Sequence, residues 1–258
     1  MSELFDIRGK VTLVTGGAQG MGRMIAEGLA AAGAKVYITS RKAEVAEQAA
    51  QEISQLGTCV PIAADLSTPE AAAAVVAEIK MYESHVNILV NNAGKTWGAP
   101  LESFPDKAWA SVMAVNVQGP FTLVREVLPL LKAGGTPKDP ARVINIGSVA
   151  GSKVEPIPAY SYAASKAAVQ HLSRVLAAEL AAHSITVNAI IPGYFPTKMT
   201  AHIREEEERM SEFTRRIPLG RLGSAQDIAG MCVFLSSPAG AYVTGTELPL
   251  DGGLSGCS

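Results

Sequence analysis

Seven short runs of apolar and often β-branched residues recur along the chain. They span residues 11–15, 35–39, 59–63, 87–91, 142–147, 185–191 and 247–250. Within each run the apolar positions are nearly continuous and do not alternate with polar ones, which is typical of strands that are buried on both faces of a sheet. The pattern therefore predicts seven strands in a sheet that is covered on both sides.

The segments between these runs carry helical patterns that are rich in alanine. The segment MGRMIAEGLAAAG, residues 21–33, ends with Gly33, a residue type that commonly terminates a helix. Strands and helices that follow one another in strict turn imply right-handed crossovers and a parallel sheet with helices on both faces. No linker, break in composition or repeat beyond this alternation divides residues 1–258. We therefore expect one doubly wound α/β domain with a seven-stranded parallel sheet.

The composition of the chain narrows the class of partner. Of its 258 residues, 22 are lysine or arginine and 24 are aspartate or glutamate, so the net charge is −2. A chain so nearly neutral does not favour nucleic acid or an acidic membrane surface as a partner. The hydrophobic share of 48% is ample for a buried core.

The cysteines and the N-terminal sequence indicate a compartment. Cysteine occurs at three widely spaced positions, Cys59, Cys232 and Cys257, which implies no disulfide framework and fits a reducing environment. The first residues, MSELFDIRGKVTLVTGG, lack the long apolar run of a signal peptide. No window approaches the roughly 18 uninterrupted apolar residues of a membrane span. We expect a soluble, cytoplasmic protein without a membrane partner.

A glycine-rich turn follows the first predicted strand. Residues 16–22, GGAQGMG, stand between that strand and a predicted helix. Glycines at such a turn allow the backbone to approach a pyrophosphate, which the free amide groups of the helix N-terminus can then bind. A tight turn without a ligand is the alternative interpretation. From Thr15 to Gly22 the motif is T-G-x-x-x-G-x-G, which differs from the G-x-G-x-x-G form.

Further motifs follow this turn in a fixed order. They are NNAG at 91–94, Ser148 in NIGSVAG, Tyr162 and Lys166 in YAASK, PG at 192–193 and DGG at 251–253. In these motifs, and over nearly all of its length, the chain resembles the short-chain dehydrogenase/reductase family. The resemblance implies a Rossmann-type fold, a dinucleotide bound mainly by the N-terminal half, and an enzyme that interconverts a ketone and a secondary alcohol.

The spacing between the serine and the tyrosine departs from the commonest family pattern. Ser148 precedes Tyr162 by fourteen residues, where thirteen is usual, and Tyr160 would be twelve away. Only Tyr162 stands four positions before Lys166, so we assign the family tyrosine to Tyr162. One additional residue in the loop GSKVEPIPA can absorb the difference. Tyr160 is then expected to line the pocket or to have a structural role.

The resemblance assigns catalytic roles to Asn116, Ser148, Tyr162 and Lys166. Because Tyr162 and Lys166 are four residues apart, they would share one face of a helix. A free phenol has a pKa near 10, and a nearby ammonium group is expected to lower it, which would let Tyr162 exchange a proton with a substrate oxygen. The resemblance implies that Ser148 bonds the same oxygen. It also implies that Lys166 bonds the nicotinamide ribose and that Asn116 helps to position a water.

The residues after the second predicted strand favour NADP(H) over NAD(H). A dehydrogenase that prefers NAD usually carries a carboxylate there, whereas this chain has Ser40, Arg41 and Lys42. The arginine fork matches the geometry of a phosphate; ordinary solvated charges at the start of a helix are the alternative. The resemblance adds to the cofactor site Gly16, Gln19, Gly20, Met21, Gly22, Asp65, Leu66, Asn92, Ala93, Gly94, Tyr162, Lys166, Pro192, Gly193 and Thr197.

Residues 194–217 follow the PG motif, where the family builds a mobile lid over its substrate. The apolar side of this segment would hold Met199, Ile203, Met210, Phe213 and Ile217, and its wet side the run from Glu205 to Glu208. An apolar inner face would suit an apolar substrate, and plain packing explains the pattern equally well. Trp97, just after NNAG, is a second candidate for the pocket.

The histidines give no sign of a metal site. They are His85, His171, His183 and His202, and none shows a spacing such as H-x-H or H-E-x-x-H. Surface or packing positions are the simpler interpretation of all four. We therefore predict no metal.

The sequence as a whole resembles bacterial 3-oxoacyl reductases, particularly the type associated with rhamnolipids. NNAGKTWGAPLESFP and ARVINIGSVAG are the segments that carry this likeness. A 3-oxoacyl thioester is therefore the expected substrate, and sugars, polyols and cyclic ketones are the alternatives. Reductases of fatty-acid synthesis dock acyl carrier protein with basic residues, and this chain has Asp139 and Ala178 at the positions taken to match. Docking of a carrier protein is left open.

Two further expectations come from the family. Its members are usually tetrameric, so we expect a homotetramer or a homodimer, although no motif in the chain proves it. A non-catalytic dinucleotide-binding protein is the alternative to an enzyme, because a fold alone does not fix a function. Such proteins commonly lose the tyrosine or the lysine, and this chain retains both.

Overall fold

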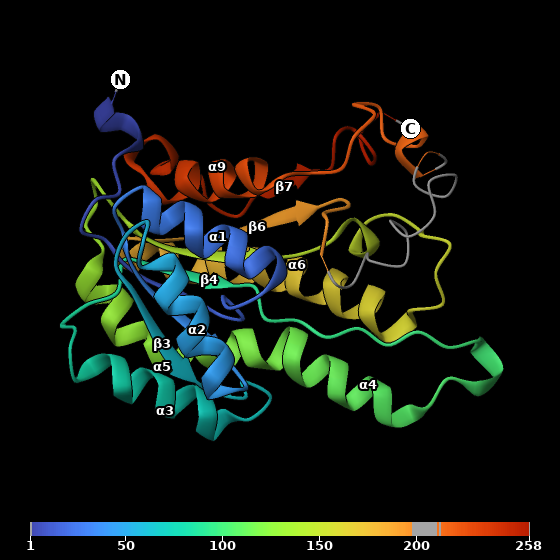
Figure 1. The fold of residues 1–258 in the computed structure, drawn as a ribbon, viewed down its shortest axis with the longest axis horizontal. Coiled ribbons are helices and arrows are strands. Elements are labelled where there is room, and N and C mark those ends of the chain that lie inside the picture. Colours follow the sequence, from blue (N-terminus) through green and yellow to red (C-terminus); the bar gives the residue numbers. More distant parts are fainter. Residues whose placement is uncertain (1, 198–210, 212, 258) are drawn as a thin grey trace.

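The computed structural model describes residues 2–197, 211 and 213–257, and a seven-stranded sheet forms its centre (Figure 1). The strands are β1 (Val11–Val14), β2 (Lys35–Ser40), β3 (Cys59–Ala63), β4 (Ile88–Asn91), β5 (Ala141–Ile146), β6 (Ile185–Pro192) and β7 (Glu247–Leu250). They lie in the order β3-β2-β1-β4-β5-β6-β7, and neighbouring strands are parallel throughout. The predicted strands and the parallel sheet are confirmed.

Helices connect the strands at the alanine-rich segments. The α-helices include α1 (Gly20–Ala31), α2 (Ala43–Ile53), α3 (Pro69–Lys80), α4 (Asp106–Met113), α5 (Gly119–Gly134), α6 (Tyr160–Leu180) and α9 (Ala225–Ser236). The short segments are η1 (Ser2–Phe5), η2 (Leu101–Ser103), η4 (Val149–Gly151), η5 (Ala181–His183), η7 (Pro238–Gly240) and the π-helical η3 (Ala114–Gln118). Gly33 has a φ of +90°, as expected of a glycine just beyond the end of α1.

Alternate residues of each strand face two separate apolar cores. Leu13 and Leu89 pack with α3, α5 and α6, whereas Val14 and Val90 pack with α1, α2 and α9. All four side chains are fully buried. Strands covered on both faces carry mostly apolar side chains on both, which explains the continuous runs in the sequence. The predicted doubly wound α/β fold is therefore confirmed.

The carboxyl edge of the sheet brings the sequence motifs together. The strand order reverses between β1 and β4, and folds of this kind bind ligands where that reversal occurs. The arrowheads of β6 and β7 in Figure 1 point toward this edge. The PG and DGG motifs meet there, because the Gly193 N–H donates to the Leu250 carbonyl at 3.0 Å. A Cβ on Gly193 would lie 2.8 Å from the Cα of Asp251.

Part of the predicted lid, at positions 198–210 and 212, lies outside the described residues. Met199, Ile203, Met210, His202 and the run from Glu205 to Glu208 belong to that part. In the remainder of the chain, no helix combines the length and apolarity that a membrane crossing requires.

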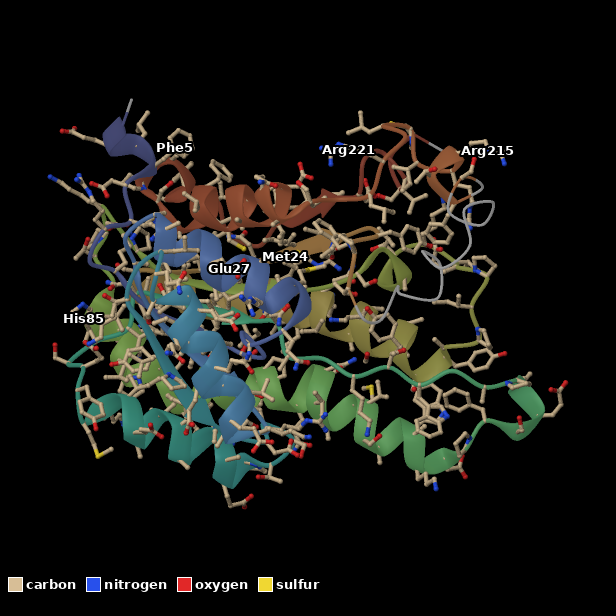
Figure 2. All side chains as sticks on the ribbon, in the orientation of Figure 1. Phe5, Met24, Glu27, His85, Arg215 and Arg221 are labelled. Carbon is tan, nitrogen blue, oxygen red and sulfur yellow. The ribbon has the colours of Figure 1, made fainter. Side chains whose placement is uncertain are left out.

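Metal-binding side chains do not gather in the part of the chain that the structure describes. No group of three or more histidine, cysteine, aspartate or glutamate side chains there could hold an ion. Figure 2 shows one of the histidines, His85, at the opposite end of the molecule from Arg215 and Arg221. His85 precedes β4, so it lies at the amino edge of the sheet, away from the motifs.

Candidate active site

Ser148, Tyr162 and Lys166 meet beyond the carboxyl end of β5. Helix α6 begins at Tyr160, which places Tyr162 and Lys166 one turn apart in its first two turns. The Lys166 Nζ lies 5.7 Å from the centroid of the Tyr162 ring. Ser148 follows β5 after Gly147, and its side chain hydrogen-bonds with that of Tyr162. The structure thus brings these three predicted residues to one place.

Burial governs the protonation of the tyrosine and the lysine. It raises the pKa of Tyr162, because the phenolate is disfavoured away from water, and the hydrogen bond with Ser148 opposes this effect. Burial also lowers the pKa of Lys166 to about 8. The Lys166 Nζ donates to the carbonyl of Ile146 at 2.6 Å. We expected Lys166 to lower the pKa of Tyr162, but desolvation raises it. Tyr162 is therefore a protonated donor at neutral pH.

Asn116 lies in the π-helical segment η3, between α4 and α5. Its Nδ2 donates to the Lys95 carbonyl and to Ser165 Oγ, both at 2.9 Å, and its Oδ1 accepts from the Lys95 N–H at 2.8 Å. Segments of π-helix often occur at functional sites. The buried Asn116 side chain therefore ties the loop after β4 to α6, and its expected part in holding a water stays a prediction.

The glycine turn after β1 has the shape that a pyrophosphate requires. Gly16 and Gly20 have φ values of +64° and +55°, a left-handed conformation that favours glycine. Helix α1 begins at Gly20, and the side chain of Gln19 at its N-cap makes no capping hydrogen bond. The first amide groups of α1, from Gly20, Met21 and Gly22, can therefore donate to a phosphate.

The NNAG motif is bonded to this turn. The N–H groups of Asn92 and Ala93 both donate to Thr15 Oγ1 at 2.9 Å, and Asn92 Nδ2 donates to the Thr15 carbonyl at 2.9 Å. Gly94 lies next to the catalytic candidates: a Cβ there would lie 3.7 Å from Asn116 Oδ1 and 3.9 Å from the Lys166 Nζ. The residues present therefore fit a dinucleotide that runs from the start of α1 toward Lys166.

Replacing Gly22 with alanine is expected to disrupt the turn. A Cβ at this position would lie 2.3 Å from both Asn92 Nδ2 and the Gly16 carbonyl oxygen, so the backbone would have to move. Overpacking of this kind costs about 1 to 3 kcal/mol. Urea denaturation should show this loss, and titration with NADPH should show weaker binding. In Gly230→Ala, the control within α9, the new Cβ would meet nothing within 4 Å. Equal stability of both variants would contradict the packing argument.

The residues predicted for the adenosine side lie next to one another. Arg41 and Lys42 follow β2 and are exposed, and neither forms an ion pair with another described residue. The Ala64 N–H donates to the Ser40 carbonyl at 2.8 Å, which brings Asp65 beside them. Asp65 is exposed, and its Oδ1 accepts from the Ser67 N–H at 3.1 Å. Leu66, next in the chain, is buried.

Residues 193–197, which follow β6, lie next to the start of α1. A Cβ on Gly20 would lie 3.7 Å from Thr197, so Thr197 faces the start of α1. Pro192 is the last residue of β6, and Gly193 connects it to this segment.

One supporting residue was not singled out from the sequence: Thr39 Oγ1 accepts from the Gly16 N–H at 3.1 Å. A threonine near the end of a buried strand is its only sequence signal.

Tyr160 packs into an aromatic cluster, as its expected structural role requires. Its ring lies edge-on to that of Phe104, with 5.3 Å between centroids. Phe104 in turn contacts Trp109 with 6.2 Å between centroids. Trp97, the second pocket candidate, is 41% exposed, so it is available to a ligand.

Known proteins resemble this chain over nearly its whole length. A family model described as Enoyl-(Acyl carrier protein) reductase matches residues 16–255. The rhamnolipids biosynthesis 3-oxoacyl-[acyl-carrier-protein] reductase of Pseudomonas aeruginosa is 44% identical over 253 residues, which cover 98% of this chain and 99% of that protein. The galactitol 2-dehydrogenase (L-tagatose-forming) of Cereibacter sphaeroides is 39% identical over 251 residues, or 97% and 96% of the two chains.

A solved structure gives the same result. The Pseudomonas aeruginosa RhlG/NADP active-site complex matches with a TM-score of 0.96 at 44% identity, covering 98% of this chain and 99% of that one. The match therefore extends over nearly the whole chain. From its ordered motifs, its sheet and these relatives, the chain belongs to the short-chain dehydrogenase/reductase family.

Proposed function

We propose that the protein is an NADP(H)-dependent oxidoreductase that interconverts a ketone and a secondary alcohol, with a 3-oxoacyl thioester as its substrate. The observation that carries this proposal is the meeting of Ser148, Tyr162 and Lys166 next to Gly94 of the NNAG motif. The relatives support it, because one is named a 3-oxoacyl reductase and its matching structure is an NADP complex.

The chain would hold the cofactor at three places. The amide groups at the start of α1 would bind the pyrophosphate, and Arg41 with Lys42 would bind the 2′-phosphate. Asn92 and Gly94 would border the ribose and nicotinamide. NADPH, when bound, supplies the hydride that the carbonyl carbon of the substrate receives.

The side chains of the site would handle the proton and the developing charge. Tyr162, which burial keeps protonated, would donate its proton to the substrate oxygen. Ser148 would donate a hydrogen bond to the same oxygen and stabilise negative charge as it forms. Lys166, which lies one turn beyond Tyr162, would bond the nicotinamide ribose and keep the phenol oriented.

Several expectations from the sequence form part of the proposal. Residues 1–258 would act as a single domain, with residues 194–217 as a lid. The protein would work in the cytoplasm as a homotetramer or a homodimer. Its partner would be a small carbonyl or alcohol substrate.

The substrate assignment predicts a dependence on the length of the acyl chain. Each buried CH₂ contributes about 0.8 kcal/mol. Lengthening the acyl chain of the thioester should therefore lower its KM roughly fourfold with each added CH₂, until the pocket is full. The measurement is the loss of NADPH absorbance with short, medium and long 3-oxoacyl substrates, compared with polyols, sugars and bulky cyclic ketones.

A flat response to chain length would exclude the acyl substrate. If a sugar ketone or polyol were turned over well at the same time, the enzyme would instead act like the 39% identical galactitol 2-dehydrogenase. Binding of NADPH without turnover of any of these compounds would favour the non-catalytic alternative.

A further inference from the structure

Glu155 is a buried carboxylate in the loop between β5 and α6, the loop that also carries Ser148. Its side chain is only 3% exposed. Tyr194 Oη donates a hydrogen bond to Glu155 Oε2, and the Arg216 Nη2 lies 4.0 Å from the same oxygen. The other oxygen, Oε1, has no hydrogen-bond partner among the described residues. A buried carboxylate is unfavourable unless it is bonded, so the position of Glu155 depends on Tyr194 and Arg216.

The two partners of Glu155 come from the segment that follows β6. Tyr194 stands directly after Gly193, and its ring lies edge-on to Phe213 with 4.0 Å between centroids. The guanidinium group of Arg216 is 5.8 Å from the centroid of the same Phe213 ring. Burial first, and then the bond to Glu155, raise the pKa of Tyr194, so its hydroxyl group stays protonated and available as a donor. Both ends of the segment after β6 thus meet at one carboxylate.

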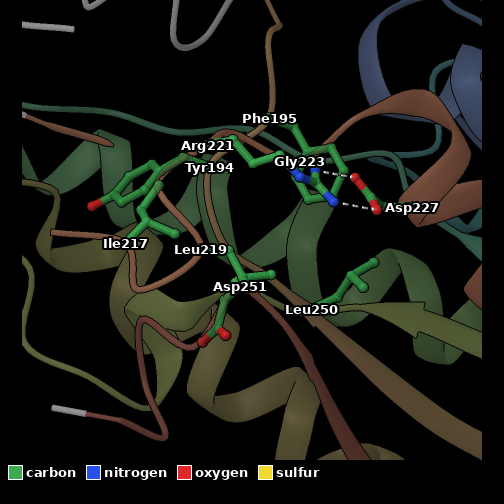
Figure 3. Close-up of a pocket in the computed structure, with 10 residues that line it drawn as sticks. Tyr194, Phe195, Ile217, Leu219, Arg221, Gly223, Asp227, Leu250 and Asp251 are labelled. Atoms are coloured by element: carbon green, nitrogen blue, oxygen red, sulfur yellow. Dashed lines mark hydrogen bonds and ion pairs between the residues drawn. The ribbon is translucent and has the colours of Figure 1, made fainter. Parts of the chain in front are cut away.

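The returning part of this segment is bonded to Tyr194, at the start of the segment, and to the loop after β7. The Gly223 N–H donates to the Tyr194 carbonyl at 2.9 Å, and the Leu219 N–H donates to the Gly252 carbonyl at 3.1 Å. Figure 3 shows Tyr194 near Ile217 around a small cavity, with Arg221 bonded to Asp227 at its rim. The bond at Leu219 attaches the segment to the loop after β7, and the bond at Gly223 joins the two ends of the segment to each other. Glu155 attaches these ends to the loop of Ser148.

We propose that Glu155 is a positioning residue for the substrate. Through Tyr194 and Arg216 it holds residues 194–197 and 213–217 against the loop that carries Ser148, and so fixes the distance between these two walls of the substrate site. This inference rests on the proposed function, because it places the ketone between these walls.

The hydrogen bond from the Tyr194 hydroxyl group to Glu155 can be tested by removing that hydroxyl group. Tyr194→Phe keeps the ring against Phe213 and removes only the bond to Glu155. We expect the KM for the 3-oxoacyl substrate to rise about tenfold, the lower range for a hydrogen bond to a charged group. The kcat and the KM for NADPH should stay within about twofold, because Tyr162 and the glycine turn are untouched.

Two comparisons separate this role from a general loss of stability. Tyr82→Phe is the matched control, since Tyr82, two residues beyond α3, is 68% exposed and its hydroxyl has no hydrogen bond to a described residue. Its kinetic constants should equal those of the wild type. Glu155→Gln keeps an acceptor for Tyr194 and loses only the attraction to Arg216, so its KM should rise less, by about threefold.

Amide hydrogen exchange supplies a readout that needs no substrate. Residues 194–197 and 213–223 should exchange faster in Tyr194→Phe than in the wild type and in Tyr82→Phe. Unchanged exchange, an unchanged KM for the ketone, or an equal rise in the KM for NADPH would each overturn the role of Glu155. If the wild type turned over no ketone at all, the proposed function would fail by itself, and exchange would still decide whether Glu155 holds the segment.

Discussion

Tyr162→Phe is expected to abolish turnover while NADPH still binds. Phenylalanine fills the same space next to Ser148 and Lys166, but it has no proton to give to the substrate oxygen. General acid catalysis by a positioned side chain contributes about 10²- to 10⁴-fold to the rate, and kcat should fall by that amount. The measurements are steady-state kinetics with the best 3-oxoacyl substrate and a separate titration of the variant with NADPH.

Tyr160→Phe is the natural control for this variant. Tyr160 belongs to the same helix and packs edge-on against Phe104, a contact that a phenylalanine ring can also make. Most of the activity should therefore remain. Comparable losses in the two variants would show that the longer loop after Ser148 has misled the assignment of the family tyrosine.

The fold could be predicted from the sequence because the sheet is buried on both faces. A strand such as β1 contributes Leu13 to one core and Val14 to the other, so no position can be polar without cost. That requirement leaves continuous apolar runs that are visible without a structure. Parallel pairing followed from the helices between the runs, because parallel strands need such crossovers.

The meeting of Ser148, Tyr162 and Lys166 could also be predicted, since each residue stands at a fixed place relative to a strand end or a helix start. The directions of the pKa shifts of Tyr162 and Lys166 could not be predicted. The spacing of Tyr162 and Lys166 suggested that the ammonium group lowers the tyrosine pKa, but the sequence does not show how far each group is desolvated. Burial decides the outcome, because it raises the pKa of Tyr162 and lowers that of Lys166.

Contacts between loops could not be predicted from the sequence either. Asn116 bonds the backbone of Lys95, and Glu155 bonds Tyr194, across separations of 21 and 39 residues. Neither pair has a periodicity or a spacing that could identify it. The π-helical turn that carries Asn116 has no composition of its own, so the sequence did not reveal it.

Arg41→Ala is expected to raise the KM for NADPH by about tenfold to a hundredfold and to leave the KM for NADH nearly unchanged. Only NADPH carries the 2′-phosphate, and a hydrogen bond to such a charged group contributes roughly 1.5 to 3 kcal/mol. Arg41 is exposed and has no carboxylate partner among the described residues, so its guanidinium group is available for a phosphate. The measurement is the initial rate at varied NADPH and at varied NADH, with the ketone saturating.

A matched control makes this result specific to the phosphate. Arg125→Ala removes an exposed arginine on α5 that pairs with Glu126 at 2.8 Å, so it changes the net charge equally at a site away from β2. Its KM for either cofactor should not change. The salt dependence should differ as well, because a contact between charged groups at the surface weakens as ionic strength rises. If the wild type used NADH as well as NADPH, the preference assigned to Arg41 and Lys42 would fail before any variant was compared.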